Sequence, residues 1–149
     1  MSLRIRPAPA LLLSAISGAA ASAGSWALLS ASDEPGQVTL PHDAADELRL
    51  IIYAASLLLI FPAIPFCFAE IAWWRAAIAA HIGGLCSTFI FDLTIERRGG
   101  QAFHDVTFLS HEYWEFFLRR SLLVGAVIFL GLSATASLKR QFLRRTGAA

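Results

Sequence analysis

The stretch richest in side chains that could do chemistry is HDVTFLSHEYWEFF, residues 104–117, which mixes histidines and carboxylates with aromatic residues. On a helix over residues 103–118 the apolar side chains gather on one side and the charged side chains on the other. His104, His111 and Glu115 share the polar side, at positions i, i+7 and i+11. Imidazole and carboxylate ligands at such spacing are able to bind Zn²⁺ or a similar divalent cation.

A fourth candidate ligand, His42, lies in an acidic connection earlier in the chain, four residues before Asp46. A divalent metal site would therefore use His42, His104, His111 and Glu115. The competing interpretations are a solvated helix face and a docking surface for a partner, and both need polar residues in these places. Because HExxH and the other recognised metal and nucleotide motifs are missing from the sequence, we predict no cofactor and keep the metal as an alternative.

His81 is the only ionisable residue that the sequence places near the middle of an apolar stretch. Ionisable groups at membrane depth are functional candidates by default. The simpler expectation is a neutral imidazole that is hydrogen-bonded between two helices. Haem ligation by two histidines would need a second histidine at this depth, which only a second copy or a partner could supply.

The composition of the chain is typical of a membrane protein. Of the 149 residues 56% are hydrophobic and 15% are charged, and the mean hydropathy is +0.60. A soluble domain has about 45–50% apolar and about 25% charged residues. A bilayer-spanning helix needs about 20 apolar residues, and stretches of that kind occupy residues 9–30, 48–69, 72–93 and 121–138.

We therefore predict an all-α, polytopic membrane protein with a single domain over residues 1–149. Four transmembrane helices form a bundle, and the amphipathic helix at residues 103–118 lies along the outer surface before Arg119 and Arg120 turn the chain into the fourth span. The first apolar stretch has a second interpretation, a signal segment cleaved after residue 23. A retained span is favoured because the apolar character continues through Leu29.

Charge and aromatic residues predict the orientation. Arginines precede the first span and basic residues follow the fourth, whereas the first connection is acidic, so both termini are expected in the cytoplasm of a bacterium with an inner (plasma) membrane. Trp26, Tyr113 and Trp114 would mark the outer interface, and Trp73 and Trp74 the inner one. Asp92 and Glu70, at span ends, would be interfacial.

Small residues predict where the helices approach each other closely. A stripe at every fourth position includes Ala76, Ala80 and Gly84 in the third span, and Gly18 has the same setting in the first. These stripes could pack together or face a partner. The two cysteines, Cys67 and Cys86, lie at different depths and are expected to be buried and unbridged.

The partners that follow are the lipid bilayer and other membrane proteins or further copies of the chain. Nucleic acid is excluded because a net charge of +1 provides no clustered basic face. The leading hypothesis is a non-enzymatic accessory or structural subunit of a larger membrane assembly. The alternatives are a small membrane enzyme or metal-binding protein with an outer histidine and carboxylate site, and a small oligomeric transporter or channel.

Overall fold

The computed structural model describes residues 6–30, 44–97 and 111–146, and four α-helices occupy these ranges apart from a short connection at residues 69–72. The helices are α1 (Pro7–Ser30), α2 (Ala44–Phe68), α3 (Trp73–Arg97) and α4 (His111–Thr146). All four are long and apolar enough to cross a membrane. The predicted all-α fold with four helices able to span a membrane is confirmed, and each predicted span falls on one helix, apart from residues 69 and 72 in the connection.

The fourth helix differs from the prediction. It runs without interruption from His111 to Thr146, so residues 111–118 are its first two turns and not a separate surface helix. Residues 103–110 of the predicted surface helix lie outside the described residues. The chain does not turn at Arg119 and Arg120, because no proline interrupts this segment and both arginines favour helix.

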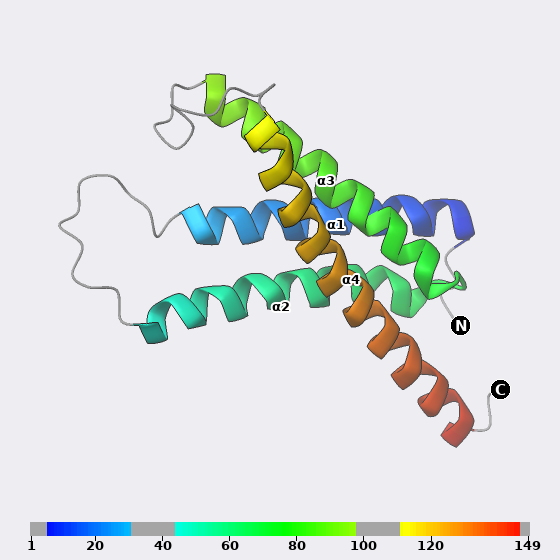
Figure 1. Ribbon diagram of the computed structural model, residues 1–149. Coiled ribbons are helices and arrows are strands. Elements are labelled where there is room, and N and C mark those ends of the chain that lie inside the picture. Colours follow the sequence, from blue (N-terminus) through cyan, green and yellow to red (C-terminus); the bar gives the residue numbers. More distant parts are fainter. Residues whose placement is uncertain (1–5, 31–43, 98–110, 147–149) are drawn as a thin grey trace.

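Successive helices run antiparallel, so that α1 begins and α4 ends at the same end of the bundle (Figure 1). Helix α1 packs extensively against both α2 and α3, whereas α2 and α3 touch each other little although only four residues connect them. Helix α4 packs against α2 and α3. The end where α1 ends and α4 begins is called the first end below, and the end where α4 ends is called the second end.

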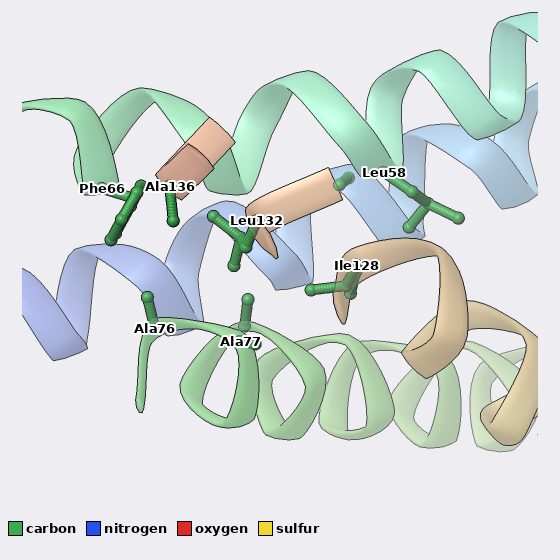
Figure 2. Close-up of a cluster of buried hydrophobic side chains, with 9 residues drawn as sticks. Leu58, Phe66, Ala76, Ala77, Ile128, Leu132 and Ala136 are labelled. Atoms are coloured by element: carbon green, nitrogen blue, oxygen red, sulfur yellow. The ribbon is translucent and has the colours of Figure 1, made fainter. Parts of the chain in front are cut away.

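The core is small and joins all four helices. Ile128 and Leu132 of α4 lie between Leu58 and Phe66 of α2 on one side and the alanines of α3 on the other (Figure 2). Only Ala21 represents α1 in this cluster. The contact between α1 and α3 is therefore made by small residues, which allow two backbones to approach closely in a membrane.

Large apolar side chains cover the outside of the bundle. Leu122, Leu130 and Ile90 are 72%, 70% and 62% exposed. Such a surface would be unusual for a protein in water, whereas in a bilayer the lipid chains cover it. Cys67 and Cys86 belong to this surface. The prediction that they are buried was wrong, because an apolar side chain gains little by leaving lipid for the protein interior.

Candidate functional site

A buried ion pair lies near the first end of the bundle. The side chain of Asp92 on α3 is buried, and Nη2 of Arg120 on α4 donates hydrogen bonds to its Oδ1 at 3.2 Å and its Oδ2 at 3.0 Å. The hydroxyl of Tyr113, also on α4, donates to Oδ2 at 3.1 Å. Asp92 is thus near the end of its span, as predicted, and its carboxylate is enclosed by protein. The carboxylate fastens the start of α4 to α3.

Helix α1 joins this group through an aromatic ring. The guanidinium carbon of Arg120 lies 3.9 Å from the ring centroid of Trp26, a close cation–π contact. The rings of Tyr113 and Phe117 stack at 6.0 Å, and Tyr113 is itself buried beside the carboxylate. Trp26, Asp92, Tyr113 and Arg120 are called the Asp92 cluster below. It links three helices and balances its own charge.

The Asp92 cluster borders a cavity of about 330 Å³ between α1, α2 and α4, called the α1–α2–α4 cavity below. Trp26 and Arg120 line it near the first end, and Leu58 and Val127 line it deeper in the bundle. A cavity of this size with few polar groups is the usual form of a small-molecule site. The remaining lining residues are Ser22, Ser25, Ile51, Ala54, Ala55, Leu123 and Val124.

The hydroxyl groups near the cavity already have protein partners. Ser22 and Thr88 share a hydrogen bond of 2.9 Å between α1 and α3. Ser25 donates to the carbonyl of Ala21 at 2.8 Å and to that of Ala54 on α2 at 2.9 Å. Each serine therefore ties α1 to a neighbouring helix.

The small residues expected to mediate packing meet in the α1–α3 contact. A Cβ added to Gly18 would overlap the backbone carbonyl of Ala80, and one added to Gly83 would overlap that of Ala15. A Cβ at Gly84 would lie 3.5 Å from the carbonyl oxygen of Gly18, which is ordinary contact. Ala76 is fully buried in the core. The stripes on α1 and α3 pack together, and Gly83 is the tight position that the four-residue spacing did not single out.

His81 lies on α3 against α4. A Cβ added to Gly125 would come within 2.8 Å of Cε1 of its ring, so the missing side chain of this glycine makes room for the imidazole. Nδ1 is buried and has no hydrogen-bond partner among the described residues. The expected hydrogen bond between helices is therefore not made by Nδ1. In this arrangement the ring fills space between two helices.

The predicted metal ligands are only partly within the described chain. His42 and His104 lie outside the described residues. His111 and Glu115 are exposed in the first turns of α4, and Glu115 forms an ion pair with Arg119. Within residues 6–30, 44–97 and 111–146, no three histidine, cysteine or acidic side chains gather where a metal could be held.

At the second end of the bundle, the Lys139 side chain of α4 caps the C-terminus of α2. Nζ of Lys139 on α4 donates to the carbonyls of Ala69 at 3.0 Å and Phe66 at 3.3 Å. The last carbonyls of a helix have no partner within it and carry a partial negative charge. Helix α2 continues through Pro62 and Pro65 and ends at Phe68. The only lysine of the chain thus joins α4 to this terminus.

Sequence reasoning did not identify the Asp92 cluster as a site. A detectable signal exists, because an acid at the end of the third span and an arginine at the start of the fourth must come to the same end of an antiparallel pair. Opposite charges at matched depth are expected to find each other in a membrane.

No model of a known protein family matches the chain, and neither do characterised proteins or solved structures.

Proposed function

We propose that this protein is a non-enzymatic accessory or structural subunit of a larger membrane assembly. The observation that carries the proposal is the length of α4. Its 36 residues extend about 54 Å, whereas the hydrocarbon core of a bilayer is about 30 Å thick. Several turns of α4 therefore extend beyond the membrane and offer surface to other proteins.

The parts of α4 near its two ends carry residue types that are common in protein interfaces. In the first turns Trp114 and Leu118 are 41% and 57% exposed, and near the second end Phe142 is 68% exposed between exposed arginines. Aromatic and arginine side chains contribute most to binding energy in protein interfaces. A helix that only anchors the protein needs no such residues beyond the bilayer.

The buried polar groups support a structural role. The Asp92 cluster, the Ser22–Thr88 hydrogen bond and the Lys139 contacts all join one helix to another. These contacts favour a structural role over a catalytic one, because each polar group is used to hold two helices together. The basic end of α4, with Arg140, Arg144 and Arg145, favours a cytoplasmic position for the second end in a bacterial inner membrane.

The test is native mass spectrometry of the untagged protein, extracted from its own membranes in a gentle detergent, together with native gels of the same extract. We expect the 16.2 kDa chain to be associated with other polypeptides and without stoichiometric metal. The replacements Leu118→Ala and Phe142→Ala truncate apolar side chains at the two ends of α4. At least one should reduce the assembled fraction about five-fold, the effect of a loss near 1 kcal/mol.

Leu130→Ala is the matched control, because Leu130 is 70% exposed on the same helix but at bilayer depth. It should leave the assembly unchanged. A chain that is always monomeric contradicts the proposal. A stoichiometric metal would favour the enzyme or metal-binding alternative at His111 and Glu115, and ion flux through proteoliposomes would favour the transporter alternative.

A further inference from the structure

The α1–α2–α4 cavity opens sideways, toward the region that a bilayer occupies. Ile51 and Leu123 line the cavity and are nevertheless 57% and 66% exposed, so they form its mouth on the outside of the bundle. Helix α1 and helix α4 make no extensive direct contact. The cavity is the space left between them.

Water is an unsuitable occupant. The lining is almost wholly apolar, and the hydroxyls of Ser22 and Ser25 are already bonded to Thr88 and to backbone carbonyls. A buried water needs two to four polar partners, and purely apolar cavities stay dry. An empty cavity would forfeit the dispersion contacts of its whole lining. Hydrocarbon is the filling that the surroundings supply.

The cavity is deep enough for the part of an acyl chain that lies nearest the headgroup. On α2 the lining extends from Ile51 to Leu58, seven residues or about 10 Å along the helix axis. Trp26 and Arg120 lie at the first end, at the level where tryptophan meets lipid headgroups, and the deeper lining is aliphatic. An acyl chain that descends from the headgroup level follows the same path.

We propose that one acyl chain of a membrane phospholipid occupies the α1–α2–α4 cavity as a resident part of the bundle. The acyl chain fills the space between α1 and α4, where these two helices do not pack against each other. Because Asp92 already balances the charge of Arg120, the site selects for the hydrocarbon and not for an anionic headgroup. The proposal stands apart from the accessory role, since a monomer would need the same filling.

A second groove provides a comparison within the same molecule. It lies between α2 and α4, has a volume of about 390 Å³ and is more open than the cavity. Leu59, Cys67 and Ala134 line it. Lipid in so open a groove exchanges with the bulk bilayer, so the two places differ in how long they retain a lipid.

The experiment uses the full-length protein purified in a gentle detergent. Retained lipid is weighed by native mass spectrometry, and a phosphatidylcholine that carries a diazirine in its acyl chain is photo-crosslinked in vesicles. Ala55→Phe fills the cavity, and Ile51→Trp blocks its mouth without entering the core. Ala134→Phe makes the same change of size in the open groove and serves as the control.

We expect the wild type and Ala134→Phe to retain one phospholipid and to be labelled on peptides from α1, α2 and α4 that line the cavity. Ala55→Phe and Ile51→Trp should reduce both signals at least ten-fold. Removal of lipid should lower the unfolding temperature of the wild type but not that of Ala55→Phe, provided that this variant folds. If it does not fold, Ile51→Trp decides on labelling alone.

Three results would overturn the proposal. Equal labelling of all variants would place the lipid elsewhere, and a wild type without retained lipid would show that the cavity is not occupied. A retained isoprenoid or quinone without phospholipid would assign the cavity to a different ligand.

Discussion

The Asp92–Arg120 ion pair allows a quantitative test of what holds α4 to the bundle. Asp92→Asn keeps the shape of the side chain but removes its charge, so that a guanidinium only 12% exposed loses its counter-ion. Removing one partner of a buried pair typically costs about 3–5 kcal/mol. Arginine does not lose its proton in proteins, so the penalty cannot be avoided by neutralisation.

The companion changes separate the charge from the packing. Arg120→Met should cost less than Asp92→Asn, because the Asp92 carboxylate keeps the hydrogen bond from the Tyr113 hydroxyl when the guanidinium is removed. The double variant leaves no buried charge, so the penalty of the unpaired guanidinium is absent and only the polar amide of the asparagine remains. We therefore expect the double variant to be about 3–5 kcal/mol more stable than the sum of the single effects predicts.

The assay is reversible unfolding in mixed micelles of dodecyl maltoside and SDS, followed by tryptophan fluorescence. Trp26 lies against the pair and contributes to the signal together with the other three tryptophans. Tyr113→Phe removes the hydroxyl and its 3.1 Å hydrogen bond to Asp92, and should cost about 1.5–3 kcal/mol. Additive effects of Asp92→Asn and Arg120→Met would refute the reasoning, because they would mean that the two charges do not interact in the folded protein.

Three further predictions concern the contacts between helices, each measured by the same unfolding assay. Gly18→Ala and Gly83→Ala should each cost about 1–3 kcal/mol, because the new methyl group meets backbone that cannot yield, while Gly84→Ala, in ordinary contact, should be neutral or slightly stabilising. Equal effects at the three glycines would contradict this. Ser22→Ala should cost about 0.6 kcal/mol, the average for a hydrogen bond between membrane helices, and a change of several kcal/mol would contradict it. Lys139→Met should cost about 0.3–1 kcal/mol by exposing the carbonyl terminus of α2, whereas an unchanged stability would show that the capping contacts contribute nothing.

The sequence was sufficient to predict the helices, because bilayer thickness sets a length and the apolar stretches meet it. Prediction failed at the start of α4, where an amphipathic pattern over residues 103–118 has the same periodicity whether the helix lies on a membrane or continues into it. The prediction that Cys67 and Cys86 are buried failed for a related reason. An apolar residue in a membrane protein packs equally well in the core or against lipid, and its type does not tell the two apart.

The candidate site was harder to predict, because it depends on which side chains meet. The histidine pattern drew attention to His111 and Glu115, which are exposed on α4. The buried cluster instead uses Asp92 and Arg120, which are ordinary residues at span ends until the helices are paired. The α1–α2–α4 cavity cannot be predicted from a sequence pattern. It arises because α1 and α4 have no side chains at this place that meet and fill the space between them.

The two kinds of helix contact in this bundle imply different roles for its parts. Helix α1 meets α3 closely at glycines and alanines, where the two backbones are almost in contact, so their relative position has little freedom. Helix α4 is fastened near the first end by Arg120 and near the second by Lys139, with a small core between them and a lateral cavity beside it. Polar contacts in a membrane have alternatives only within the protein, so they fix the register of α4 even where packing is loose. By the proposed function, α4 extends beyond the bilayer. A partner that binds its ends would therefore act on the least densely packed part of the bundle.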